Sequence, residues 1–63
     1  MQMLTKQETA KRLRIHPESL MRMVRLGQFP APIRVGAGIH ARVRFDEADV
    51  ERWLEVKKAD ASA

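Results

Sequence analysis

The stretch TKQETAKRLRIHPESLMRMVRLG, residues 5–27, decides the fold, because it holds two short helical patterns separated by a tight turn. Thr5 and Glu8 have capping-box spacing, in which the hydroxyl and the carboxylate each bind a backbone N–H at the start of a helix. Small and apolar side chains then follow at helical spacing as far as Leu13. We therefore predict a first helix over residues 6–13.

A second helix is predicted from Pro17 to Leu26. Proline suits the first helical position because its missing N–H has no helical partner there, and its ring keeps His16 out of the helical conformation. Gly27 is a typical residue just beyond a helix C-terminus. Two helices this close together predict either a helix-turn-helix or an ordinary helical hairpin, and their spacing alone favours the hairpin.

A β-hairpin is predicted next, because residues 33–35 and 41–45 both alternate between apolar and basic side chains around a glycine-containing turn. The period of two assigns Ile33, Val35, Val43 and Phe45 to one face, and Arg34, Arg42 and Arg44 to the other. Three arginines on one ribbon face suit phosphate contacts or insertion into a narrow minor groove. The alternative is a solvated face with no partner.

Asp46 is predicted to cap a last helix that starts with acidic side chains and ends at Lys57 and Lys58, as the helix dipole prefers. Trp53 is expected in the core of the fold. We therefore expect a small α+β domain over residues 1–58, with three short helices and a two-stranded β-hairpin wing in the order α-α-β-β-α. Residues 59–63 are small and polar, and we expect this tail to fray.

The net charge of +4 is unevenly distributed along the 63 residues. Residues 1–45 carry nine basic and two acidic side chains, whereas residues 46–63 carry three basic and six acidic ones. Most of the basic side chains are arginines, which make bidentate contacts with phosphate and guanine. A basic cluster of this kind indicates double-stranded DNA as the partner.

The composition argues against several other function classes. The chain has two histidines and no cysteine, and no plausible catalytic triad or metal cluster is evident, so we expect no enzyme, metal, cofactor or small-molecule ligand. The apolar runs are far shorter than the roughly 20 residues that span a bilayer. No signal-peptide pattern precedes the first polar residues. We therefore expect no membrane partner and a cytoplasmic location.

The stretch from Leu4 to Leu54 resembles the winged helix-turn-helix of the MerR-like superfamily, and within it the small phage and prophage excisionase and AlpA-type regulator domains. The matching pieces are LTKQETA at residues 4–10, LRI at 13–15, LMRMVRLGQFP at 20–30, VRFD at 43–46 and VERWL at 50–54. Each piece is short, but their order and spacing together are specific to the fold.

The resemblance implies that residues 16–25 supply a recognition helix and residues 33–45 a wing. The predicted DNA contacts are His16, Pro17, Glu18, Ser19, Arg22 and Arg25 on the helix, Arg34, His40, Arg42 and Arg44 on the wing, and Thr5 and Lys6 on the DNA backbone. Met21 is expected to pack at the edge of the core rather than to touch a thymine methyl. The family usually opens the recognition helix with serine or threonine, so the His16–Pro17 pair prevents any transfer of base preference.

The resemblance also implies architectural binding to direct repeats, with DNA bending, head-to-tail self-association and an integrase or recombinase as partner. It thereby predicts an excisionase, also called a recombination directionality factor. The alternative is a prophage or mobile-element transcriptional regulator of the AlpA type, which uses the same surface. An alternative of another class is a protein-interaction module that uses the acidic last helix, and the salt dependence of DNA binding distinguishes it.

Overall fold

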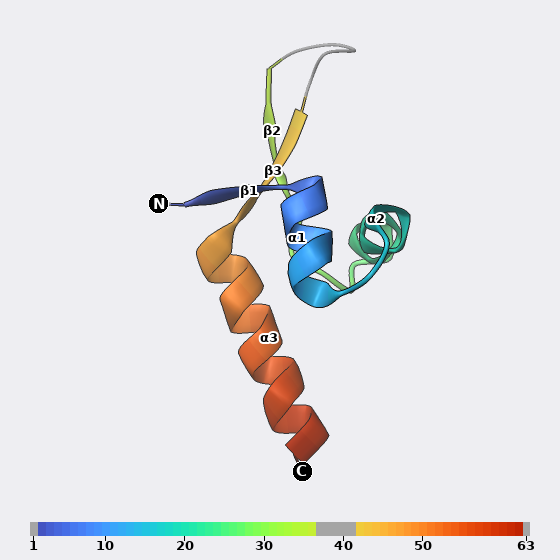
Figure 1. Ribbon diagram of the computed structural model, residues 1–63, viewed down its shortest axis with the longest axis vertical. Coiled ribbons are helices and arrows are strands. Elements are labelled where there is room, and N and C mark those ends of the chain that lie inside the picture. Colours follow the sequence, from blue (N-terminus) through green and yellow to red (C-terminus); the bar gives the residue numbers. More distant parts are fainter. Residues whose placement is uncertain (1, 37–41, 63) are drawn as a thin grey trace.

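The computed structural model describes residues 2–36 and 42–62, and Figure 1 shows the arrangement of its elements. These are β1 (Met3–Thr5), α1 (Lys6–Leu13), α2 (Pro17–Arg25), β2 (Ile33–Val35), β3 (Arg42–Asp46) and α3 (Glu47–Ser62). Three helices with a small antiparallel sheet confirm the predicted α+β fold. The first two helices begin where the sequence predicts, and α2 ends one residue earlier, at Arg25.

The sheet contains one strand that the sequence analysis missed. β2 and β3 form the predicted hairpin wing, and β1 adds a third strand on the other side of β3. The β1–β3 ladder sets Leu4 opposite Phe45, and both side chains are buried. A strand of three residues is too short to show an alternating pattern, so the sequence alone did not indicate β1.

The register of the wing differs from the prediction. Directly opposite residues in an antiparallel ladder point to the same face, and the pairs here are Ile33 with Arg44, Arg34 with Val43, and Val35 with Arg42. Both predicted faces were therefore wrong. Arg42 and Arg44 share one face of the ribbon with Ile33 and Val35, whereas Arg34 lies on the other face with Val43. Alternation shows which residues of one strand share a face, but the connection and the pairing set the register between strands.

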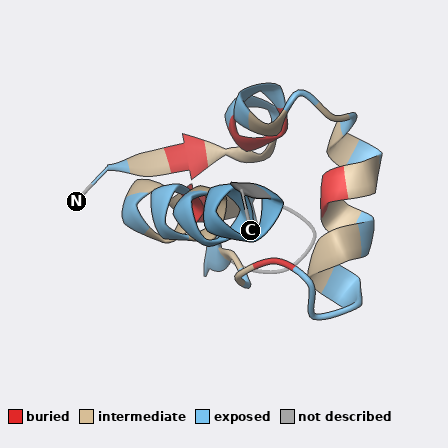
Figure 2. Ribbon diagram, turned by 90° about the horizontal axis from the view of Figure 1, so that it is seen from below, coloured by how far each residue is buried: buried red, intermediate tan, exposed pale blue. Residues whose placement is uncertain are grey.

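The core lies between the helices and the sheet, and Figure 2 shows the buried segments on the sides of the elements that face one another. Its buried apolar residues are Leu4, Ala10, Leu20, Phe29, Phe45 and Val50. The Phe29 ring makes edge contacts with Phe45 and Trp53, at centroid distances of 5.7 and 5.0 Å. Trp53 packs against this core and stays partly exposed, so it contributes to the core from its margin.

α3 begins at the predicted cap, where the Asp46 carboxylate accepts a hydrogen bond of 2.9 Å from the Ala48 backbone N–H. The helix continues to Ser62, beyond the lysine pair at which the sequence predicts its end, and it extends away from the rest of the fold (Figure 1). The fraying of residues 59–63 stays a prediction. Within residues 2–36 and 42–62, no helix combines the length and the apolar character that a membrane crossing requires.

Candidate nucleic-acid interface

The turn between α1 and α2 depends on a left-handed residue at position 14. Arg14 has φ of +57°, and the backbone N–H groups of Arg14 and Ile15 bond back to Lys11 and Ala10 at 3.1 and 3.0 Å. This pairing terminates a helix with a left-handed residue, a position that glycine usually takes. The turn directs the chain into α2, so that the two helices meet in helix-turn-helix fashion.

His16 caps α2. Its Nδ1 accepts a hydrogen bond of 3.2 Å from the Glu18 backbone N–H, while its own backbone is extended. The imidazole therefore does what the oxygen of serine or threonine does at other helix N-termini. His16 and Glu18 are exposed, whereas Pro17 and Ser19 are half-buried.

One face of α2 is charged and open to solvent. Glu18, Arg22 and Arg25 are all exposed and are spaced by four and three residues, so they form one row along the helix. On the other face Leu20 is fully buried, and Met23 and Val24 pack against the core. The helix thus presents two arginines along its exposed row while its apolar side anchors it.

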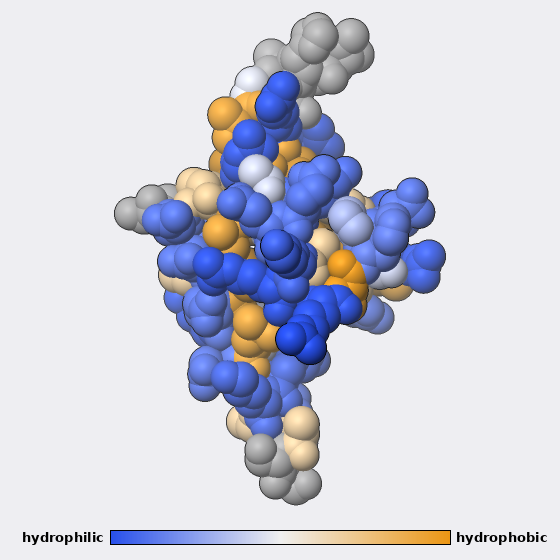
Figure 3. Space-filling model, viewed as in Figure 1, coloured by the Kyte–Doolittle hydropathy of each residue, from blue (hydrophilic) through white to orange (hydrophobic). Residues whose placement is uncertain are grey.

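The wing presents arginines on both of its faces. Arg34 and Arg42 are exposed, and the ladder turns them to opposite faces. Arg44 is half-buried, and its Nη1 donates a hydrogen bond of 2.9 Å to the Val43 carbonyl oxygen. Ile33 and Val35 are 49% and 53% exposed, and apolar surface is visible beside hydrophilic surface on the wing (Figure 3). The predicted contact His40 lies outside the described residues.

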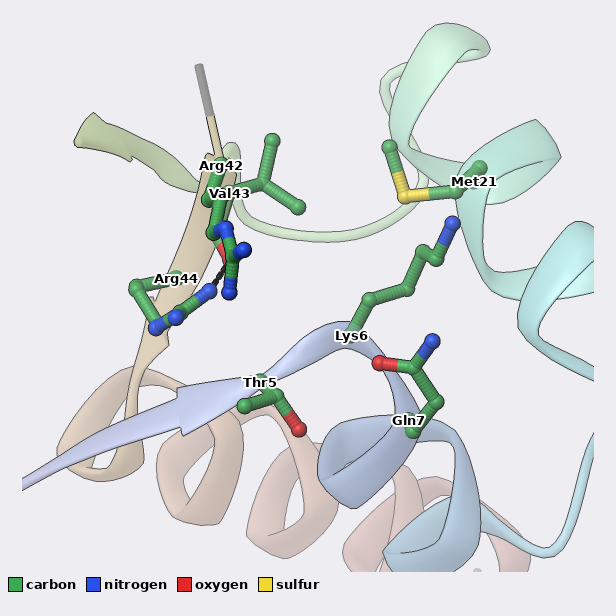
Figure 4. A pocket seen from close by; sticks show the side chains of 7 residues that line it. All are labelled: Thr5, Lys6, Gln7, Met21, Arg42, Val43 and Arg44. Carbon is green, nitrogen blue, oxygen red and sulfur yellow. Dashed lines mark hydrogen bonds between the residues drawn. The ribbon is translucent and has the colours of Figure 1, made fainter. Parts of the chain in front are cut away.

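A groove of about 420 Å³ lies between α2, the start of α1 and β3, and we call it the basic groove. It is lined by Thr5, Lys6, Gln7, Met21, Arg42, Val43 and Arg44. Figure 4 shows the side chains of Lys6 and Met21 on one side of the groove and the two arginines of β3 on the other. The structure therefore brings together predicted contact residues from two distant stretches of the sequence, namely Thr5 and Lys6 near the N-terminus and Arg42 and Arg44 on β3.

Three residues of the basic groove were not among the predicted contacts: Gln7, Met21 and Val43. Gln7 is exposed beside Lys6, and the sequence alone has no signal for it, because the groove depends on the unpredicted pairing of Thr5 with Arg44. Met21 and Val43 pack against the core, as expected of Met21, and they also line the groove. The one signal in the sequence was the position of Met21 on the second helix, which lies directly before Arg22, a predicted DNA contact.

Two ionisable side chains of α1, Glu8 and Arg12, are held by partners within the fold. The Thr5 backbone N–H and hydroxyl hold the pKa of the Glu8 carboxyl below its ordinary value, and the charges of Arg12 and Arg44 act in the same direction. The Glu8 carboxylate accepts from the Thr5 N–H at 2.8 Å, which confirms the predicted capping box. Arg12 binds Glu47 and Glu51 of α3 at 2.8 and 2.7 Å, so this cation joins α1 to α3 instead of serving the groove.

A family model described as a helix-turn-helix domain matches residues 3–57, which run from β1 into the second half of α3. No curated protein and no solved structure matches the chain. In the part of the chain that the structure describes, no group of three histidine or carboxylate side chains is placed to hold a metal ion.

Proposed function

The chain belongs to the helix-turn-helix domain family, a family of DNA-binding domains, and on that premise we propose that it is an architectural protein that serves an integrase as an excisionase. Under this proposal α2 lies in the major groove and the wing reaches the adjacent minor groove. As part of the same proposal, the protein acts on DNA in the cytoplasm as a non-enzymatic regulator. The resemblance to small excisionase and AlpA-type domains supports this finer assignment.

The row of exposed charges on α2 supports its role as the recognition helix. A helix of nine residues fits the B-DNA major groove, which is about 12 Å wide. Arg22 and Arg25 lie on the exposed row, and arginine binds the O6 and N7 atoms of guanine in a bidentate manner. The anchored apolar side of the helix holds these two side chains on a rigid element. We propose that Arg22, one turn into the helix, reads a base edge.

The wing supports a minor-groove contact because it has cations on both faces. The B-DNA minor groove is about 6 Å wide and is bordered by a phosphate backbone on each side. A ribbon inserted into it meets phosphates on both of its faces. Arg34 on one face and Arg42 on the other satisfy that requirement, which a ribbon with cations on one face would not.

The observation that carries the proposal is that Met21 of α2 and Arg42 and Arg44 of the wing line one groove. The candidate recognition helix and the candidate wing are therefore neighbours, as an interface with two adjacent DNA grooves requires. A plasmid excision assay tests the excisionase role, using an integrase from the same genome and its attachment sites. Excision that depends on the added protein supports this role, and equal excision without it removes the role.

A transcriptional regulator of the AlpA type is the second candidate, because it would use the same surface. A reporter placed behind the bound promoter, measured in a strain that lacks the integrase, separates the two roles. Regulation that persists there, together with excision that does not need the protein, favours the regulator.

A protein-interaction role for the acidic α3 has less support, because four of its five carboxylates already have intramolecular partners. Glu47 and Glu51 bind Arg12, Asp49 binds Arg52 at 3.0 Å, and Glu55 binds Lys58 at 3.7 Å. These exposed pairs contribute little stability, but they reduce the negative field that a basic partner would recognise.

Head-to-tail self-association on DNA is a further part of the proposal. The half-exposed Ile33 and Val35 give β2 an apolar surface next to the arginines of the wing. A neighbouring copy on a direct repeat can cover that surface. Ile33→Thr keeps the preference for strand structure and is expected to reduce cooperativity on a two-site duplex by a larger factor than it reduces single-site affinity. Unchanged cooperativity would remove this contact from the proposal.

A further inference from the structure

The start of α2 depends on a side chain for its first hydrogen bond. Pro17 brings no N–H, and the first bond of the helix backbone runs from the Leu20 N–H to the His16 carbonyl oxygen at 3.1 Å. The N–H groups of Glu18 and Ser19 come before it, where a helix has no carbonyl to accept from them. The Nδ1 atom of His16 accepts from the Glu18 N–H at 3.2 Å. The imidazole is therefore the cap of this helix.

A histidine cap differs from the usual capping residues because a proton can remove its acceptor. The side-chain oxygens of serine, threonine and asparagine accept at any pH near neutrality, whereas histidine ordinarily changes its charge between about pH 5 and 8. Both ring nitrogens of a protonated imidazole are donors. A protonated His16 can therefore no longer accept from the Glu18 N–H, and its charge lies at the positive end of the helix dipole.

The charged groups next to this cap come from the end of α1, the turn and the start of α2. α1 is packed against α2, and its last turn carries Lys11 and Arg12, followed by Arg14 in the turn. Arg12 is bound by two carboxylates of α3, and Glu18 is the acidic side chain in the first turn of α2. The imidazole itself is exposed, so water can deliver the proton that removes the cap.

The sequence also predicts His16 as a direct DNA contact, and the two roles respond to acid with opposite signs. A protonated histidine beside a phosphate strengthens binding, because it adds a positive charge next to an anion. A protonated cap weakens binding, because it loosens the first turn of the helix that carries the contact residues. The capping bond favours the second role, since it turns the Nδ1 side of the ring toward its own helix.

We propose that His16 makes DNA binding by this chain sensitive to pH, because protonation of its imidazole uncaps α2. The inference rests on the proposed function, since it takes α2 as the helix that enters the major groove. At neutral pH the cap holds the first turn, and with it Glu18 at the start of the exposed row that leads to Arg22. On acidification that turn frays and the row loses its fixed spacing. The serine or threonine caps of the resembling family would not titrate in this range.

The affinity for a specific duplex, measured at about pH 7.5 and about pH 5.5, brackets the charge change of histidine. We expect the parent chain to bind about two- to tenfold more weakly at the lower pH, which corresponds to the loss of a helix cap. His16→Asn keeps a capping oxygen that does not titrate, so its affinity should change far less. His40→Asn is the matched control, because the chain has two histidines, and it should keep the loss of affinity.

The outcomes separate this inference from the proposed function. No binding at either pH would overturn the proposed function, and the inference with it. Binding that responds to pH equally in the parent chain and in His16→Asn would overturn the inference alone. Affinity that rises on acidification in the parent chain but not in His16→Asn would assign His16 to a phosphate and would also overturn the inference alone.

An NMR pH series of the free chain observes the cap without DNA. The backbone amide signal of Glu18 should shift with the same midpoint as the ring signals of His16, because one proton ends their hydrogen bond. This shift should be absent from His16→Asn and retained in His40→Asn. A Glu18 amide signal that does not follow the His16 ring would overturn the inference, whatever the DNA titrations show.

Discussion

The indole Nε1–H of Trp53 donates a hydrogen bond of 3.0 Å to the backbone carbonyl oxygen of Gln28. The same indole ring packs against Phe29 with an interplanar angle of 60°. Both contacts hold α3 against the segment that leaves α2 and leads into the wing. The last helix therefore braces the segment that joins α2 to β2.

Trp53→Phe should remove this hydrogen bond and keep most of the aromatic packing. We expect the free energy of unfolding to fall by about 1 kcal/mol, because the Gln28 carbonyl loses its donor. Urea titration followed by circular dichroism measures the change. Unchanged stability would show that the Gln28 carbonyl does not depend on the indole.

Arg14→Gly should stabilise the fold by up to about 1 kcal/mol, because a residue with a Cβ is disfavoured at the left-handed φ of +57°. Gly27 gives the matched control, since it ends α2 with the same pairing at φ of +72°, and no neighbouring atom lies within 4 Å of the position that a Cβ would take there. Gly27→Ala should therefore destabilise the fold by about 1 kcal/mol without a steric clash. Thermal unfolding of both variants checks the pair, and a loss of stability in Arg14→Gly would contradict it.

Glu8→Gln should change the pH dependence of stability. The folded state holds the pKa of Glu8 below its ordinary value of 4.5, so the ionised carboxylate stabilises the fold above that pH. This contribution is lost as the pH falls from 4.5 through the lowered pKa, because the folded state must then take up a proton. The difference in Tm between the parent chain and Glu8→Gln should accordingly shrink on acidification. A difference that stays constant with pH would exclude this role for the carboxylate.

Arg22→Ala should weaken specific binding by about 1–3 kcal/mol if Arg22 reads a base, with a much smaller loss on random DNA. Arg42→Ala provides the contrast, because the loss of a phosphate contact weakens binding to all sequences similarly. Competition gel shifts with specific and random duplexes measure both variants. Equal losses on both duplexes for Arg22→Ala would reassign it to the DNA backbone.

The helices of this fold were predictable because their signals are local. The capping box at Thr5, the proline at position 17 and Gly27 each act through neighbouring backbone groups, and all three perform in the structure as expected. The left-handed Arg14 was not predicted, because nothing in an arginine side chain favours that conformation. Arg14 adopts this conformation because the chain must turn there between two helices that pack against each other.

The interface was less predictable because it depends on pairing between distant strands. The β1–β3 ladder sets Thr5 opposite Arg44 and thereby builds the basic groove, and the β2–β3 ladder turns Arg34 away from Arg42. Neither register can be obtained from alternation within one strand. The residue types of the interface were therefore visible in the sequence, whereas their grouping around one groove required the structure.

We propose that this chain binds duplex DNA through the arginines of α2 and the wing together with Lys6. Fluorescence anisotropy with a labelled duplex, repeated over a series of salt concentrations, tests it most directly. If these side chains neutralise about five phosphates, log affinity should fall against log salt with a slope of about −4 to −5. A flat salt response, or no binding at low salt, would contradict DNA binding through these side chains.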